Sequence, residues 1–288
     1  MLTQPPERNG KWRSLNPLVH LHTLILFTWT DYQTIVIPIT IFACATAPIQ
    51  SLSKLIQGCV WIWFHLILCN VSNQVRAKEE DSINRPWRPL PSGRVAFQKT
   101  LVFRWIMVIL CVIWSAIYGF DIVVTTLGLI ITTIFYDEGQ VSRHPFGRNL
   151  CNVGRYIAFQ FGATTIMNRL DRTSMAAILL SGVMILTTIQ AQDFPDVDGD
   201  IASNRITFPI YTPELSRVFT FFIIPLWSFI LCWFWEVGWL TGFTHITFSI
   251  YVGARYYFRR TPGADTNATA YSELNIALGN ELPTSRFF

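Results

Sequence analysis

Charged side chains are scarce in this 288-residue chain. Lys, Arg, Asp and Glu together make up 14% of the residues, whereas hydrophobic residues make up 51%. Soluble domains carry about 25% charged residues, so the deficit excludes an ordinary soluble protein. The net charge of +4 calls for no nucleic-acid partner, because basic loops beside a membrane account for it. The composition therefore indicates an integral membrane protein.

Several familiar signatures are also missing. The chain has no glycine-rich nucleotide loop, no Ser-His-Asp arrangement and no zinc-ligand spacing. Its six cysteines form no CxxC pair and fall in or at the edge of apolar runs, which favours packing roles over disulfide or metal use. No cleavable signal peptide is predicted, because the first apolar run is too long for one and follows a polar, basic segment.

Long apolar runs are what the chain does contain. A membrane-spanning helix needs about 20 apolar residues, and backbone amides inside lipid must be paired within their own segment. The runs lie approximately at residues 22–48, 51–75, 97–118, 119–136, 150–168, 172–192, 216–236 and 238–258. We therefore predict an all-α, polytopic membrane bundle of about eight transmembrane helices, forming one integral membrane domain over residues 1–288.

The basic residues predict the orientation of this bundle. If residues 1–20 form a cytosolic tail, the loops after every second helix are cytosolic as well, and these segments hold most of the 22 Lys and Arg residues. The opposite side holds only Lys54, Arg169 and Arg172. This bias agrees with the positive-inside rule. Residues 261–288 contain only a short semi-apolar piece, so we expect a polar C-terminal tail and no ninth helix.

Two polar clusters follow even-numbered helices and are therefore predicted to share the cytosolic face. The first reads NQVRAKEEDSINRPWRPLPSGR over residues 73–94, and the second reads QDFPDVDGDIASNR over residues 192–205. On helices, Asn73, Glu80 and Asp81 would project to one side. The same holds for Asp193, Asp196 and Asp200. Two acid-rich helix ends on one membrane face suggest a shared site.

The residue types in these clusters indicate a metal and a phosphate. Converging carboxylates repel one another unless a cation neutralises them, and oxygen ligands favour Mg²⁺, which bridges carboxylates to phosphate oxygens. The guanidinium groups of Arg85, Arg88 and Arg205 lie in the same loops and are placed to bind phosphate bidentately. The predicted magnesium ligands are Asn73, Glu80, Asp81, Asp193, Asp196 and Asp200. A diphosphate substrate fits this chemistry.

With these motifs the chain resembles the UbiA-type prenyltransferase superfamily. Family members carry Asn-Asp-x-x-Asp-x-x-x-Asp, often followed by Asn-x-Pro-x-Arg-Pro-x-x-Ser-Gly, and the segment from Asn73 to Gly93 fits this in register. The second family motif matches DFPDVDGD and the tail NRITFP, from Asp193 to Pro209. The resemblance implies a helical bundle around a lipid-accessible cavity, usually of nine helices. It also implies Mg²⁺ bound by both motifs and ionisation of a prenyl diphosphate.

The departures from the family pattern are informative. Gln74 and Ala77 stand where the first motif has aspartates, and Glu79 and Glu80 are the candidate substitutes. This altered form resembles the fungal branch of membrane-bound terpene cyclases. Tyr136 matches a tyrosine that the family often places near the phosphate. The lysine that usually follows this tyrosine is absent, so Arg143 and Arg148 are candidate replacements.

We therefore predict an enzyme that ionises a prenyl diphosphate and cyclises it to a terpene, with Asp193, Asp196, Asp200, Glu80 and Asp81 as catalytic carboxylates. One alternative is a prenyltransferase that passes the prenyl group to an aromatic or other small acceptor. A second is a non-catalytic protein that binds or transports prenyl diphosphates. The predicted partners are substrate and membrane lipid, without an obligate protein partner, and the predicted location is the endoplasmic reticulum with the site facing the cytosol.

The prolines of the first cluster and one acid in the first apolar run are also informative. Three prolines between residues 83 and 94 fix the backbone and disfavour helix before each of them, so we predict an extended flap over the cavity mouth, with Arg85 and Arg88 as lid residues. Asp31 is a charge within an apolar run, and such charges are costly and often functional.

Overall fold

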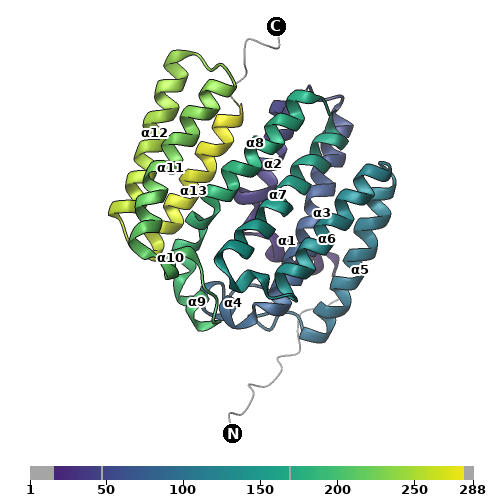
Figure 1. Ribbon diagram of the computed structural model, residues 1–288. Helices are drawn as coiled ribbons and strands as arrows, with labels where there is room; N and C mark the ends of the chain where they lie inside the picture. The colour runs from purple at the N-terminus through teal and green to yellow at the C-terminus, as the bar shows by residue number, and fades with distance from the viewer. Residues whose placement is uncertain (1–15, 47, 169, 282–288) are drawn as a thin grey trace.

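The computed structural model describes residues 16–46, 48–168 and 170–281, and every regular element in these ranges is a helix (Figure 1). Three helices begin at residues whose side chains accept a hydrogen bond from a backbone N–H of the first turn, namely Asn16, Ser51 and Asp171. Such caps satisfy amide groups that have no partner within the helix. The predicted all-α fold class is confirmed.

The elements follow the predicted apolar runs closely. The first half of the chain forms α1 (Pro17–Thr28), η2 (Tyr32–Val36), α2 (Ile37–Thr46), α3 (Leu52–Arg76), α4 (Lys78–Asn84), α5 (Phe97–Ala116) and α6 (Phe120–Asp137). The second half forms η3 (Val141–Arg143), α7 (Pro145–Met167), α8 (Arg172–Thr188), η4 (Ile189–Asp196), α9 (Val197–Ala202), α10 (Phe208–Tyr211), α11 (Pro213–Phe234), α12 (Trp239–Phe258) and α13 (Pro262–Glu281). The predicted tail over residues 1–20 lies outside the described residues up to position 15.

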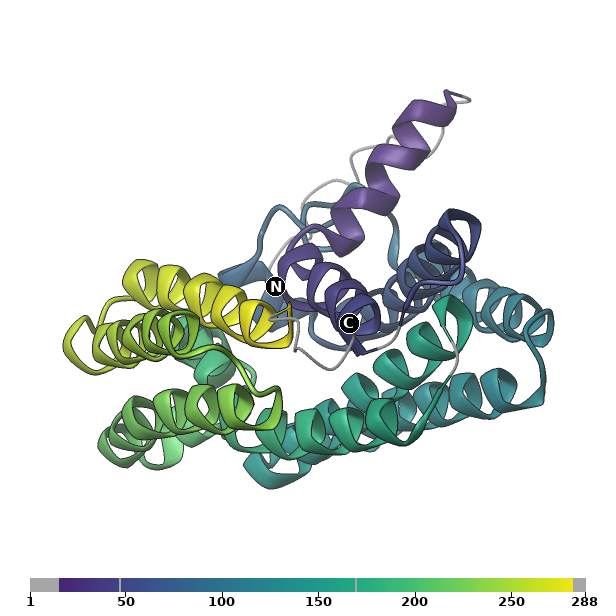
Figure 2. The ribbon, with the colours of Figure 1, turned by 90° about the horizontal axis from the view of Figure 1, so that it is seen from above.

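The first apolar run is not one straight helix. It divides into α1 and the pair η2–α2, which are bent by 65° relative to each other at a short break. The residues after the break, Tyr32–Val36, form a π-helix, and such irregular helices often mark functional positions. Seen end-on, α1 projects beyond the other helices, whereas α2 lies among them (Figure 2).

The outer surface of the bundle is apolar. Five helices in the described ranges are long and apolar enough to cross a membrane, and counting the bent first pair as one span gives up to six. Trp105 on α5, Trp233 on α11, and Trp239 and Phe243 on α12 are all more than half exposed. A continuous exposed apolar surface of this kind is suited to lipid rather than water. The chain is a polytopic membrane protein.

The C-terminal segment differs from the prediction. No ninth helix was expected after residue 260, but Pro262–Glu281 form α13, which packs against α2, α11 and α12. Among residues 262–272 its buried side chains are small or polar, namely Asp265, Ala268 and Ser272. Arg217 on α11 donates two hydrogen bonds of 2.9 Å to the Asp265 carboxylate. A helix that is held by polar contacts does not need a long apolar run. The sequence therefore lacks the pattern by which membrane helices are recognised.

A pocket lies between α2, α7, α8, η4, α12 and α13. Most of its lining is apolar or aromatic, as with Ile39, Tyr156, Met184 and Tyr256. Gln192 of η4 also lines the cavity, so the cavity adjoins the second acidic motif, which begins at the next residue.

Candidate active site at the α4–α9 end of the bundle

The two acidic motifs meet at one end of the bundle, where α4 packs against α9 (Figure 1). The approach is close, because Gly199 of α9 lies directly beside the Asn84 side chain of α4. Asn84 Nδ2 also donates a hydrogen bond of 3.2 Å to the backbone oxygen of Asp196. The predicted proximity of the two motifs is therefore observed, and side chains far apart in the sequence face one another across this contact.

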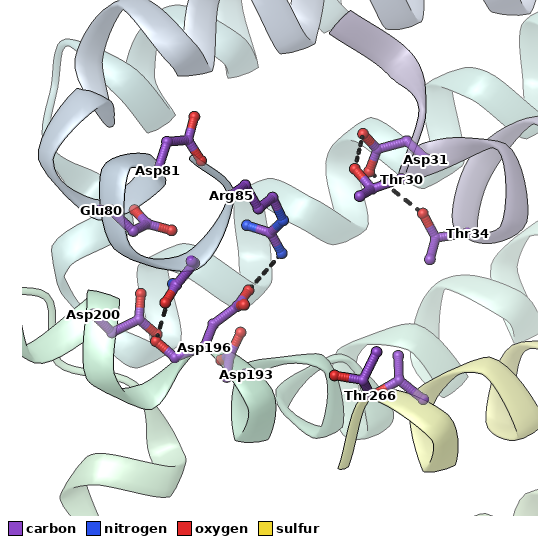
Figure 3. A network of polar contacts seen from close by, with 12 residues as sticks. Thr30, Asp31, Thr34, Glu80, Asp81, Arg85, Asp193, Asp196, Asp200 and Thr266 are labelled. Atoms are coloured by element: carbon purple, nitrogen blue, oxygen red, sulfur yellow. Dashed lines mark hydrogen bonds and ion pairs between the residues drawn. The ribbon is translucent and has the colours of Figure 1, made fainter. Parts of the chain in front are cut away.

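The second motif does not form a regular α-helix. Asp193 and Asp196 lie in η4, a 3-10 helix that contains Pro195, and Asp200 lies in the short helix α9. Proline removes a backbone donor and disfavours a continuous α-helix, so the helical spacing assumed from the sequence is only approximate. Asp193 and Asp200 are nevertheless buried, and Figure 3 shows them beside Asp196.

The first motif is likewise divided between two helices. Helix α3 ends at Arg76, Ala77 caps it, and α4 carries Glu80 and Asp81, which are both buried. The break separates Asn73 from these two acids. Asn73 Nδ2 donates a hydrogen bond of 3.3 Å to Asp137, so the assumed single helical face is not present.

The acids of α4 and α9 are paired with arginines. Arg88 Nη1 donates to both carboxylate oxygens of Asp81, at 2.9 and 3.2 Å. Arg205 Nη1 lies 2.6 Å from Glu80 Oε2 and 3.3 Å from Asp200 Oδ1. The Arg205–Glu80 pair is not aligned for a hydrogen bond, so Glu80 Oε2, like Asp200 Oδ2, is buried without a hydrogen-bond partner among the described residues.

The acids of η4 are paired in the same way. Arg148 of α7 forms an ion pair with Asp193, and Arg85 Nη2 donates a hydrogen bond of 2.7 Å to Asp196 Oδ2 (Figure 3). Each carboxylate predicted to bind a metal therefore contacts a guanidinium group. These arginines satisfy the negative charge, which would otherwise be costly to bury.

Burial and neighbouring charges act in opposite directions on groups around α4. Burial raises the pKa of the Asp81 carboxyl above its ordinary value, and Arg88 and Arg85 offset only part of this rise. Burial alone would lower the pKa of the Arg85 guanidinium, but the carboxylates of Asp196, Asp31 and Asp81 raise it above the ordinary value. The electrostatic influence of Asp31 thus reaches the site from the break in the first membrane helix.

The predicted extended flap over residues 83–94 is not observed. After α4 the chain folds into consecutive turns, with backbone hydrogen bonds from Arg88 N to Arg85 O and from Ser92 N to Arg88 O. Proline fixes φ at a value that these turns also use, which is why the prolines did not impose an extended path. Arg88 is only 6% exposed, so in this structure it lies inside the site.

A second polar group lies beside Asp193. Arg148 Nη1 donates a hydrogen bond of 3.3 Å to the Tyr136 hydroxyl, and the Arg155 guanidinium lies 4.0 Å from the centre of the Tyr136 ring, a cation–π contact. Arg143, the other candidate replacement for the family lysine, is exposed. Asp137, which accepts the hydrogen bond from Asn73, was not among the residues predicted from the sequence. Its position directly after Tyr136 could have indicated it.

The donor atoms suit magnesium, because carboxylate and amide oxygens are its usual protein ligands. Within the described ranges, however, no three His, Cys, Asp or Glu side chains are arranged to hold a metal ion. Arginines contact at least one oxygen of each of these carboxylates, whereas Asp200 Oδ2 has no hydrogen-bond partner among the described residues. Metal binding at these residues therefore requires the carboxylates to exchange guanidinium partners for the ion.

Comparison with known proteins identifies the family of this chain. The model of the UbiA prenyltransferase family matches residues 35–278. The fumagillin beta-trans-bergamotene synthase af520 of Aspergillus fumigatus is 30% identical over 225 residues, which cover 74% of this chain and 77% of that protein. The polyprenyl transferase eriF of Hericium erinaceus is 30% identical over 209 residues, covering 69% and 72% of the two chains.

The fold is also shared with solved structures. A UbiA homolog from Archaeoglobus fulgidus, solved bound to GPP and Mg²⁺, superposes with a TM-score of 0.66 at 14% identity, over 89% of this chain and 97% of that one. At this level of identity the likeness establishes the fold alone.

Proposed function

Because this chain belongs to the UbiA prenyltransferase family, we propose that it is a membrane-bound terpene cyclase that ionises a prenyl diphosphate with the aid of magnesium. The observation that carries the proposal is the set of paired acids and arginines contributed by both motifs beside an apolar cavity. The relatives include proteins named terpene synthases and proteins named prenyl transferases, and we propose the cyclase reaction for this chain.

The proposed reaction is intramolecular. The bond between the first prenyl carbon and the diphosphate oxygen breaks, and its electron pair leaves with the oxygen. A double bond of the same chain then attacks the resulting carbocation and closes a ring. Finally, a proton leaves a neighbouring carbon, whose C–H electron pair forms a new double bond, or water adds to give an alcohol. The product is a cyclic hydrocarbon or a cyclic alcohol.

In the proposed site, the carboxylates bind the metal and the arginines bind the diphosphate. Asn73 and the carboxylates of Glu80, Asp81, Asp193, Asp196 and Asp200 would hold Mg²⁺. When bound, the ion would supply Lewis-acid stabilisation of the negative charge on the departing diphosphate. The paired arginines would donate charge-assisted hydrogen bonds to phosphate oxygens. In this scheme the arginines are Arg85, Arg88, Arg148 and Arg205, with Tyr136 and the exposed Arg143 as outer contacts.

The cavity supports the cyclase assignment. Its apolar and aromatic lining is suited to a folded hydrocarbon chain, and Tyr156 and Tyr256 are among the aromatic residues that line it. Aromatic faces stabilise cations, and apolar walls reduce the access of water that would capture the carbocation. Relatives named a bergamotene synthase and a diterpene cyclase point the same way.

A prenyltransferase is the second candidate. It shares the ionisation step and differs only in passing the cation to a separate acceptor. The 30% identity to a protein named polyprenyl transferase favours it. A third candidate, a protein that binds prenyl diphosphate without ionising it, rests on Ala77, which stands where the family motif has an aspartate.

One experiment separates the three. Purified protein in lipid nanodiscs is incubated with Mg²⁺ and prenyl diphosphates of several lengths, with and without a panel of aromatic acceptors, and products and released diphosphate are both measured. We expect cyclic hydrocarbon or alcohol without any acceptor. Product that forms only with an acceptor would replace the cyclase by a transferase, and binding without diphosphate release would leave only the binding role.

We further propose location in the endoplasmic reticulum with the site facing the cytosol.

A further inference from the structure

Asp31 is a carboxylate at the break in the first membrane helix. It lies between α1 and η2, where the chain bends by 65°. Irregular backbone at membrane depth is stable only where it is buried in protein or lines a cavity, and a charge there is costly unless it has partners. Asp31 has several partners, and they connect it to the candidate site.

Three uncharged groups hold the carboxylate. Asn70 of α3 donates a hydrogen bond of 2.7 Å to Asp31 Oδ2. The hydroxyls of Thr30 and Thr34 donate to the same carboxylate at 3.1 and 3.5 Å (Figure 3). Asn70 also donates to the backbone oxygen of Phe27 at 3.0 Å, which fixes the end of α1 against α3. The position of the Asp31 carboxylate is therefore set independently of the arginines.

Arg88 links this carboxylate to the first motif. Its Nη1 atom contacts Asp81, while its Nη2 atom lies 3.9 Å from Asp31 Oδ2 and donates a hydrogen bond of 3.3 Å to Thr30 Oγ1. The guanidinium thus stands between two carboxylates, with the close contact to Asp81 and the long one to Asp31. Arg88 is buried, so its positive charge must be compensated by protein groups rather than by water.

Metal binding disturbs this balance. Mg²⁺ bound to Asp81 would take one or both of the oxygens that Arg88 Nη1 contacts, and so would weaken that pair. A buried charge that loses its partner is strongly destabilising. Asp31 is the other carboxylate that Arg88 contacts, and a small movement of the guanidinium would shorten that contact.

We propose that Asp31 is a positioning residue that takes over Arg88 when Asp81 binds magnesium, and so keeps the guanidinium beside the diphosphate. The inference rests on the proposed magnesium and diphosphate site, but not on whether the product is cyclised or transferred. The break in the first membrane helix, which carries Asp31, would thereby contribute to the binding of Mg²⁺. Asp31 itself contacts neither the metal nor the substrate.

The test measures metal loading without turnover. Thermal unfolding of the purified full chain is followed in nanodiscs during titration with Mg²⁺ in the presence of inorganic diphosphate. Asp31→Asn keeps the size of the side chain and removes its charge, and we expect the apparent Mg²⁺ affinity to fall about tenfold, the scale of a partly buried ion pair. Asp121→Asn is the control, because Asp121 is an exposed acid at the start of α6. Its titration should match that of the unmodified protein.

A double-mutant cycle with Arg88→Gln shows whether Asp31 acts through Arg88. If it does, Asp31→Asn adds little to the effect of Arg88→Gln. An unchanged Mg²⁺ affinity in Asp31→Asn, or effects of the two changes that simply add, would overturn the inference. If Asp31→Asn does not fold, Thr30→Val removes the other group that holds Arg88, and an unchanged affinity in that variant would overturn it equally. A wild-type protein that shows no response to Mg²⁺ with diphosphate would instead refute the magnesium site itself.

Discussion

Among single residues, the pairing of each predicted metal-binding carboxylate with an arginine is the most informative feature. The partners come from different parts of the chain: Arg148 lies on α7, Arg85 follows α4, and Arg205 follows α9. Buried ion pairs are weak evidence for stability, because burying two charges is costly. We interpret these ion pairs as the metal-free state of the site. In this state the guanidinium groups neutralise the carboxylates, a role that the metal would take over when it binds together with diphosphate.

Asp200 offers the sharpest test of this interpretation. It is fully buried, and its Oδ2 atom has no hydrogen-bond partner in the described structure. We expect Asp200→Asn to reduce turnover roughly 100-fold or more, because loss of a metal-binding carboxylate removes several kcal/mol of stabilisation from the developing charge. The rate of diphosphate release from a prenyl diphosphate is the measurement, with thermal unfolding to verify that the protein is folded.

Asp198 provides the matched control two residues away. It lies on the same short helix but is exposed, so Asp198→Asn changes the same charge without reaching the paired arginines. We expect near-normal release of diphosphate from this variant. Equal losses in the two variants would mean that net charge at this end of the bundle matters rather than the position of Asp200.

Among the elements, the contact between α4 and α9 is what joins the two motifs. A Cβ atom built on Gly199 would lie 2.2 Å from Asn84 Nδ2, which is far inside van der Waals contact. Glycine is therefore required there for close approach rather than for an unusual backbone conformation. The sequence motif contains this glycine, but only the packing of the two short helices shows its role.

The substitution Gly199→Ala tests that contact directly. The added methyl group must displace the Asn84 side chain from its hydrogen bond to Asp196 or move α4 away from α9, and overpacking of this kind typically costs about 1–3 kcal/mol. We expect a lower unfolding temperature together with slower diphosphate release, because the acids of the two motifs separate. Gly128→Ala is the control, since a methyl carbon added to Gly128 of α6 would meet no described atom within 4 Å. An unaffected Gly199→Ala enzyme would remove the α4–α9 contact from the mechanism.

Helix α13 shows how an element can be missed in a sequence. Its buried side chains among residues 262–272 are small or polar, and Arg217 of α11 makes a bidentate contact with Asp265. An apolar run marks a membrane helix because polar groups are costly to expose to lipid. A helix that buries its polar face against other helices carries little of that signal, although it supplies Thr269 and Ser272 to the cavity wall.

At the scale of the whole molecule, the basic loops and the position of the site make a joint prediction. Both motifs lie at one end of the bundle, and the positive-inside rule places that end in the cytosol. A chain without its six cysteines is given single cysteines at Ser203 in the second motif or at Thr173 at the opposite end. In sealed microsomes, we expect a membrane-impermeant reagent to label only position 203. Labelling at position 173 alone would invert the orientation.

The sequence allowed much of the architecture to be predicted, because long apolar runs and the asymmetry of basic loops reflect the cost of placing polar groups in lipid. It predicted the all-α fold and the family, and it predicted that the acids of the two motifs lie close together. It did not predict the break before η2, and it assigned an extended path to residues 83–94. Both depend on which backbone groups find partners in the folded chain, as with Arg88 N and Arg85 O.

What the sequence determined by itself is therefore the membrane class, the residue types of the site and their proximity to helix ends. These follow from composition and local spacing, which act over a few residues. Only the tertiary structure decided which charges meet: that Arg88 lies between Asp81 and Asp31, that Arg205 contacts acids of both motifs, and that α13 closes the cavity. The physical reason is that such pairings join residues distant along the chain, and a charge finds its partner only when packing has fixed the distance between them.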